Sequence, residues 1–341
     1  MKKKIIFFAI KFLVISLTLN SQTNLQWAKT IGGVNDDASS SVTVDGAGNV
    51  YTTGYFNGTV DFDPGVGIYT LTSLGSDDVF ISKLNASGNF VWAKQLGGAN
   101  NERGLSITVD VSGNVYTLGW FGGITDFDPG VAVYNFTSAI GGSYDMFISK
   151  LDASGAFVYA KQFDGSRGLS IAVDINSNVY TAGSFIGTVD FNPGAGVFNL
   201  TAVGGNDIFI SKLDAFGSFV FAKTMGGYGN DYSSSITIDA VGNIYTTGAF
   251  NGTSDFDPGA GVYNLATVAG AATGVFISKL DISGAFVWAK QLGGTAGGGY
   301  GNCIVVDGTG NVYTTGNFMG TLDFDPGASV YNLTGPGSND V

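Results

Sequence analysis

Short stretches of alternating apolar and polar residues recur along this chain, and each is followed by a turn sequence. Residues 41–44 (SVTV) lead through 45–48 (DGAG) into 49–54 (NVYTTG), and residues 79–84 (VFISKL) lead through 85–88 (NASG) into 90–94 (FVWAK). Period-two runs rich in β-branched and aromatic residues, joined by Asp/Asn-x-x-Gly, predict antiparallel hairpins. Beyond residue 21 no segment sustains the 3.6-residue period of a helix, so the sequence predicts an all-β protein.

The hairpins belong to a repeat of about 65 residues. One marker of the repeat is Asp-Phe-Asp-Pro-Gly, or Asp-Phe-Asn-Pro-Gly in one copy, starting at Asp61, Asp126, Asp190, Asp255 and Asp323. A second marker, aromatic-Ala-Lys, recurs in step with it, starting at Trp27, Trp92, Tyr159, Phe221 and Trp288. Five copies of one unit therefore make up nearly all of the chain after the first 21 residues.

Each unit contains four predicted strands, which we name A to D in chain order. Tandem four-stranded units predict the blades of a β-propeller, with a B–C insertion carrying the Asp-Phe-Asp-Pro-Gly motif. Strand A has a small residue at one recurring position, which suits the crowded central channel, and strand D has the bulky aromatic of the outer rim. The small residues are Ser41, Ser106, Ser170, Ser235 and Cys303. The short A–B and C–D turns are expected at one face and the long B–C and D–A connections at the other.

The repeat resembles a known family. Residues 109–116 (VDVSGNVY) and 147–155 (FISKLDASG) are similar to the SBBP (seven-bladed beta-propeller) repeat of secreted bacterial proteins. The resemblance covers roughly residues 25–341 and implies a propeller in an extracytoplasmic setting, without assigning a reaction. The leader and the Asp-Phe-Asp-Pro-Gly insertions resemble exported proteins of Bacteroidetes-type bacteria.

The first residues predict export. Three lysines at positions 2–4 precede an apolar run that only Lys11 interrupts, and Ser21 offers a small residue for cleavage. We therefore expect a signal peptide over residues 1–21, a propeller domain over 22–341 and a secreted or cell-surface location. The domain begins with a strand D, contains four full A–B–C–D sets and ends after one more A and B. We accordingly expect a propeller that is incomplete at the C-terminus, belonging to a longer chain.

The net charge and the composition of the chain limit the classes of partner that it can bind. The net charge is −12, and removing the leader leaves 11 basic against 27 acidic residues, about −16. Such a surface repels nucleic acid, so we expect no nucleic-acid partner, and no integral membrane span after cleavage. The single cysteine, Cys303, cannot form an internal disulfide. We interpret it as a residue of similar volume to the serine found at this position in the other four copies.

The side-chain inventory argues against an enzyme. The chain has no histidine, which excludes Ser-His-Asp and Cys-His arrangements, and it has two arginines, too few for the arginine triad of a sialidase. Residues 151–159 resemble the docking repeat of quinone-dependent dehydrogenases, but no unique acidic base accompanies them. A quinoprotein-type or glycosidase-type enzyme remains the alternative function, beside a purely structural spacer.

The Asp-Phe-Asp-Pro-Gly motif allows two interpretations. In an extended strand its two acidic residues share one face about 6.5–7 Å apart, which suits a shared calcium ion. Asp-Pro-Gly is also strong turn chemistry, because Asp accepts from the backbone, Pro presets φ and Gly takes positive φ. No cofactor is required, and the possible calcium ligands are Asp61, Asp63, Asp126, Asp128, Asp190, Asn192, Asp255, Asp257, Asp323 and Asp325. The aspartates that close strand A, such as Asp45, are expected to be turn caps.

The D–A loops differ most between copies, and loops on a rigid scaffold often carry function. Their polar and aromatic residues, which stand outside the repeat pattern, are candidates for binding a glycan or a protein. These residues are Asp36, Asp37, Glu102, Arg103, Asp164, Arg167, Asp231, Tyr232 and Tyr300. The predicted function is therefore a binding, adhesion or scaffold module at the cell surface, with the site on the face that carries the long loops.

Overall fold

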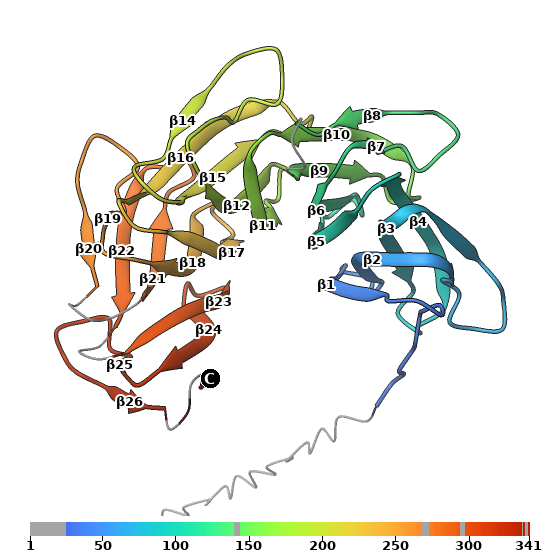
Figure 1. Cartoon of the computed structure of the whole chain (residues 1–341). Helices are drawn as coiled ribbons and strands as arrows, with labels where there is room; N and C mark the ends of the chain where they lie inside the picture. Colours follow the sequence, from blue (N-terminus) through green and yellow to red (C-terminus); the bar gives the residue numbers. More distant parts are fainter. Residues whose placement is uncertain (1–24, 140–143, 268–272, 294–296, 336, 338–339) are drawn as a thin grey trace, which may run out of the picture.

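The computed structural model describes residues 25–139, 144–267, 273–293, 297–335, 337 and 340–341. The predicted signal peptide lies outside these residues. Every regular element among the described residues is a β-strand, and the pairings between these strands are antiparallel, which confirms the all-β propeller prediction. Figure 1 shows the sheets following one another around an arc, with β1 and β2 at one end and β23 to β26 at the other.

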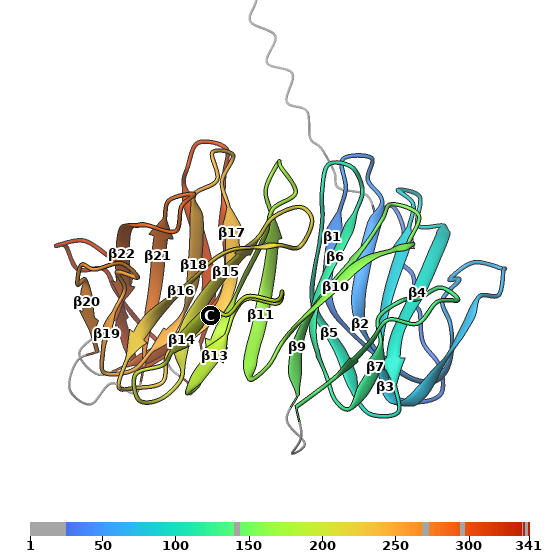
Figure 2. The ribbon, with the colours of Figure 1, turned by 90° about the horizontal axis from the view of Figure 1, so that it is seen from above.

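Four blades contain all four predicted strands and a fifth contains A and B. In blade 1, strands A to D are β1 (Ala38–Val44), β2 (Val50–Asp61), β3 (Thr70–Leu84) and β4 (Phe90–Gly98), and in blade 2 they are β5 (Glu102–Val109), β6 (Val115–Phe121), β9 (Asp145–Leu151) and β10 (Phe157–Phe163). In blade 3 they are β11 (Ser166–Val173), β12 (Val179–Phe185), β15 (Asp207–Leu213) and β16 (Phe219–Gly227), and in blade 4 they are β17 (Tyr232–Ile238), β18 (Ile244–Phe250), β21 (Gly274–Leu280) and β22 (Phe286–Leu292). Strands A and B of blade 5 are β23 (Gly298–Val306) and β24 (Val312–Met319). Figure 2 shows these blades edge-on, with turns at both ends of the strands.

The blades adhere through apolar layers between successive sheets. One layer joins Tyr51, Ile81 and Trp92 of blade 1 to Ile107 and Phe121 of blade 2, and all five side chains are buried. Equivalent layers lie between blades 2 and 3 and between blades 3 and 4. Because the chain forms no internal disulfide, this burial is the main source of its stability.

The small residue of strand A joins neighbouring blades near the channel. Ser41 Oγ accepts a hydrogen bond from the amide of Ile107 in the next blade, at 3.3 Å. Ser106, Ser170 and Ser235 repeat this bond at 3.2–3.3 Å with the blades that follow them. Cys303 takes the same position in blade 5, where it is exposed. The recurrence of a small residue therefore has two reasons, close approach of the innermost strands and a hydrogen bond between them.

Each insertion forms a hairpin on the outer perimeter (Figure 1), and in blades 1 to 4 its aromatic residue packs against the first residue of strand D of the same blade, as Tyr134 does against Phe157. The hairpins are formed within β2 and β3 in blade 1 and by β7 (Ile124–Asp126) with β8 (Asn135–Thr137), β13 (Thr188–Asp190) with β14 (Asn199–Thr201), β19 (Thr253–Asp255) with β20 (Asn264–Ala266), and β25 (Thr321–Asp323) with β26 (Asn332–Thr334) in the others. Gly97 of β4 pairs with Asp126 of β7, and Gly226 of β16 pairs with Asp255 of β19. Through these pairings the insertions also connect neighbouring blades.

Residues 25–33, predicted as a strand D, lie beside blade 1 without joining a named strand. Trp27 Nε1 donates to the carbonyl of Ala86 at 3.1 Å, and Gly32 forms an isolated bridge with Asp61. The segment therefore contacts blade 1 as each strand D contacts the blade after it. No helix in the described part of the chain has the length and apolar character needed to cross a membrane.

Candidate functional site

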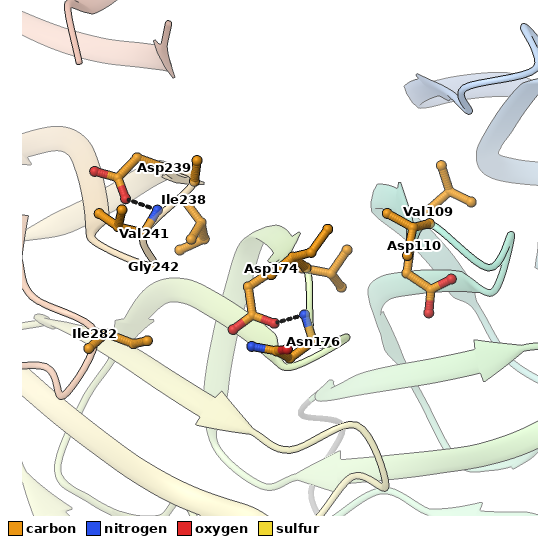
Figure 3. Close-up of a pocket in the computed structure, with 13 residues that line it drawn as sticks. Val109, Asp110, Asp174, Asn176, Ile238, Asp239, Val241, Gly242 and Ile282 are labelled. Atoms are coloured by element: carbon orange, nitrogen blue, oxygen red, sulfur yellow. Dashed lines mark hydrogen bonds between the residues drawn. The ribbon is translucent and has the colours of Figure 1, made fainter. Parts of the chain in front are cut away.

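The face formed by the A–B and C–D turns has a cavity of about 280 Å³ at the inner edge of blades 2 to 4 (Figure 3). Asp110, Asp174 and Asp239 contribute one carboxyl group each, and Ile282 contributes part of the apolar lining. The carboxyl groups come from three successive blades, which gives the cavity a repeated pattern of acidic and apolar groups.

These carboxyl groups are occupied by their own turns. Asp110 accepts from the amides of Ser112 and Asn114, from the Asn114 side chain, and from the hydroxyl of Tyr116, all at 2.8–2.9 Å. Burial acts to raise the pKa of Asp110, but these bonds and one from Ser177 of the next blade outweigh it and lower the pKa. The same bonds recur at Asp45 and Asp239. The prediction that these aspartates cap turns is confirmed.

The Asp-Phe-Asp-Pro-Gly motifs form the bends of the rim hairpins. Asp61 Oδ1 accepts from the amides of Asp63 and Tyr69, at 3.0 and 2.9 Å, and Asp63 Oδ1 accepts from the amide of Gly65 at 2.8 Å. The central Phe62 is buried against Phe56 and Phe80. The predicted acceptance of backbone amides by the aspartates is therefore confirmed in the first copy, but the predicted positive φ of the motif glycine is wrong, because Gly65 has no positive φ. The other four copies make the same bonds, through Asp126 and Asp128, Asp190 and Asn192, Asp255 and Asp257, and Asp323 and Asp325.

Three of the candidate loop residues turn out to share one structural position. Asp37, Glu102 and Asp231 each accept a hydrogen bond from a glycine amide four residues earlier, at 2.7–2.9 Å. Each also accepts from the end of strand B or from the insertion: Asn57 to Asp37, Thr125 to Glu102, and Asn251 and Ser254 to Asp231. The interpretation that they stand outside the repeat is wrong, because loops of different sequence place an equivalent carboxyl group there. Glu102 and Asp231 are fully buried, so a ligand cannot reach them in this conformation.

Four further candidates also share a position, near the start of strand A: Arg103, Arg167, Tyr232 and Tyr300. Arg103 forms an ion pair with Asp77 of blade 1 at 2.6 Å, and its guanidinium lies 3.9 Å from the ring centroid of Tyr55. It therefore joins two blades. Arg167 and Tyr300 are exposed, and the hydroxyl of Tyr232 accepts from Asn206 at 3.3 Å. The last two candidates, Asp36 and Asp164, are exposed, and Asp164 accepts from Gln162 at 2.8 Å.

Sequence reasoning missed a pair of grooves on the rim, at the junctions of blades 2 and 3 and of blades 4 and 5. Their volumes are about 360 and 500 Å³. Each lies between successive insertion hairpins, and its lining combines a tyrosine of one hairpin, the Ala-Lys-Gln of strand D and the bend of the next hairpin. The available signal was the lysine of aromatic-Ala-Lys, which recurs in step with the hairpins that flank it.

Fold and repeat together define a β-propeller-repeat protein. A repeat family described as "Beta-propeller repeat" (SBBP) matches residues 287–317, from strand D of blade 4 to strand B of blade 5. An uncharacterized WD repeat-containing protein, L264, of Acanthamoeba polyphaga mimivirus is 23% identical over 334 residues, covering 81% of this chain and 24% of that protein. The chain thus spans about a quarter of the length of this curated relative.

Solved structures give only distant matches. A protein of unknown function from Bacteroides caccae aligns over 62% of this chain and 89% of its own, with 10% identity and a TM-score of 0.21. Two structures of the extracellular domain of BT4673 from B. thetaiotaomicron align over 90% and 84% of this chain and 56% and 48% of their own, with 10% and 14% identity and TM-scores of 0.18. Similarity at this level describes neighbours without assigning their properties to this chain.

Proposed function

We propose that this chain is an extracytoplasmic binding module that attaches to a glycan or protein through its rim, without catalysing a reaction. The observation that carries the proposal is the repeated contrast between the two sides of each rim hairpin. The motif phenylalanine on the inner side, such as Phe62 or Phe127, is fully buried. On the outer side a β-branched residue stands 68–81% exposed in each of the five copies: Ile68, Val133, Val197, Val262 and Val330.

Exposed apolar residues scattered singly need no explanation, but a repeated set on anchored hairpins is a contact surface. Hydrogen bonds within each bend, and pairing to the preceding blade in the hairpins of blades 2, 4 and 5, hold this surface in place, so little conformational entropy is lost when a ligand binds it. The lysine-rich start and the apolar run after it support export, which would place this surface outside the cytoplasm.

Binding by the purified chain tests this function. The chain is screened against a panel of glycans, cell-surface proteins and intact bacterial cells, beside a variant with all five outer residues changed to Ser. We expect the parent chain to bind at least one member of the panel and the five-residue variant not to bind that member. Phe216→Ser, an equally exposed position on the turn face, is the matched control and should bind like the parent. If neither protein binds any member of the panel, the result would favour a purely structural spacer instead.

A further inference from the structure

The two rim grooves are built from the same parts. At the junction of blades 4 and 5, Tyr263 comes from one hairpin, Lys290 from strand D, and Asp323 and Asp325 from the next hairpin. At the junction of blades 2 and 3 the corresponding residues are Tyr134, Lys161, Asp190 and Asn192. A groove of 360–500 Å³ falls in the size range of small-ligand sites.

The groove at the junction of blades 4 and 5 presents hydrogen-bond capacity that the described residues leave unused. Lys290 is exposed, and its ammonium group makes no hydrogen bond or ion pair with another described residue. Asp323 uses Oδ1 for the amides of Asp325 and Tyr331, at 3.0 and 2.8 Å, and no described residue donates to its Oδ2. One groove therefore offers a cationic donor and a carboxylate acceptor together.

An aromatic ring completes each groove. The ring of Tyr263 lies 4.8 Å from that of Phe286, and the ring of Tyr134 lies 4.9 Å from that of Phe157. This packing fixes the tyrosines while 38% of Tyr263 and 41% of Tyr134 remain exposed. A fixed ring with an exposed face is apolar on its surface and polar at its hydroxyl.

We propose that the junction grooves are subsites for a neutral oligosaccharide, an inference that rests on the binding function above and names its ligand. Sugar rings have an apolar C–H face for the tyrosine and hydroxyl groups that both donate and accept, which suits a lysine beside a carboxylate. The net charge of −12 disfavours polyanions, and the lysine partly balances the carboxylates in each groove. A polymer of repeating sugars would engage several grooves at once, and such linked binding strengthens attachment.

The junction of blades 3 and 4 offers an internal comparison. Phe198 stands there in place of the tyrosine, and Thr224 in place of the glutamine, while Lys223 and Asp255 are retained. Phe198 keeps the same packing, 4.9 Å from Phe219, and the same 39% exposure. This junction has the apolar ring without its hydroxyl, so it should be the weaker subsite.

The test uses an array of neutral oligosaccharides of glucose, mannose, galactose and xylose, followed by calorimetric titration with the best binder and with its polymer. We expect the double variant Tyr134→Leu, Tyr263→Leu to bind the polymer about 10- to 100-fold more weakly. The same variant should bind two fewer copies of the short oligosaccharide per chain than the parent does. The double variant Lys161→Ala, Lys290→Ala should weaken binding in the same direction, and Phe198→Tyr should strengthen it.

Each variant is first shown to keep the parent's melting temperature and circular dichroism, and Phe216→Ser serves as the control that should bind normally. Sugar binding that all groove variants leave unchanged would overturn the inference. An array without any binder would overturn it too, and the proposed function would still stand if the chain retained a protein or cell in the broader panel. Failure of both experiments would remove the function along with its ligand.

Discussion

The pKa values of acidic side chains are shifted in opposite directions at the two ends of the blades. At the turn face, Asp110 lies in a tight turn where hydrogen bonds from Asn114 and Tyr116 outweigh the effect of burial and lower its pKa. At the opposite end, burial raises the pKa of Glu102 to about 7, and repulsion from nearby Asp78 and Asp77 adds to the effect. Both ends are equally repetitive, so repetition alone does not reveal what an acidic residue does. The balance between burial, which raises the pKa, and hydrogen bonds to the carboxylate, which lower it, does.

The loop end contains a second such pair in blades 3 and 4. Burial raises the pKa of Asp207 to about 6, with a contribution from Asp231. Oδ1 of Asp78 and Oδ1 of Asp207 are buried without a hydrogen-bond partner among the described residues. Blade 4 has Gly274 at the position of Asp78 and Asp207. Buried carboxyl pairs of this kind hold a proton more tightly than the unfolded chain does.

The largest expected effect is therefore a stability that falls as pH rises. Because the pKa values of Glu102 and Asp207 are raised on folding, their stabilising contribution is complete below about pH 4 and is lost between about pH 4 and 7. With about 1.4 kcal/mol per pKa unit, reduced by screening, we expect a combined loss of about 3 kcal/mol. Urea unfolding at pH 4.5 and 7.5 measures it.

Two variants sharpen this pH comparison. Glu102→Gln combined with Asp207→Asn should reduce the dependence between pH 4.5 and 7.5, since two of the carboxyl groups with raised pKa values then no longer titrate and Asp78, Asp145 and Asp231 remain. Asp45→Asn, at the turn face, should leave the slope in this window intact, because the pKa of Asp45 is lowered and its contribution is lost only in more acidic solution. A slope that is unchanged in the first variant would show that other groups are responsible.

A smaller effect is expected from removing a turn carboxylate. Asp110→Ala leaves the hydroxyl of the buried Tyr116 without its acceptor and breaks the bond from Ser177 of blade 3. We expect a loss of about 2 kcal/mol in the free energy of unfolding, measured by urea titration. Asp307→Ala is the matched control, because Asp307 makes the same turn in blade 5 but is only partly buried there, and its partner Tyr313 is exposed. Equal losses at the two positions would contradict the role given to burial and to the neighbouring blade.

The sequence predicted the repeated parts of this molecule well and the contacts between repeats poorly. Strand order, turn caps and the small residue of strand A follow from local patterns such as Asp45-x-x-x-Asn49 and Ser41. The equivalence of Asp37, Glu102 and Asp231 was missed although the sequence carries a signal for it, because each stands four residues after the second glycine of a Gly-Gly pair, at residues 32–33, 97–98 and 226–227. The rim grooves were missed for a different reason, since Lys290 and Asp323 belong to different repeats and meet only when the chain folds.

The smallest expected effect concerns calcium at the rim hairpins. Their carboxylates differ from those at both blade ends, because loop amides engage Oδ1 of Asp323 and Asp325 while Lys290 lines the same groove. A neighbouring ammonium disfavours a cation, and among the described residues no three acidic, histidine or cysteine side chains are placed to hold a metal ion. We therefore expect the melting temperature to stay within about 1 °C when calcium is raised to millimolar concentration. A larger rise that disappears in Asp323→Asn, but not in Asp36→Asn, would instead establish a calcium site in the hairpin and would require the groove's ligand to be reconsidered with the ion in place.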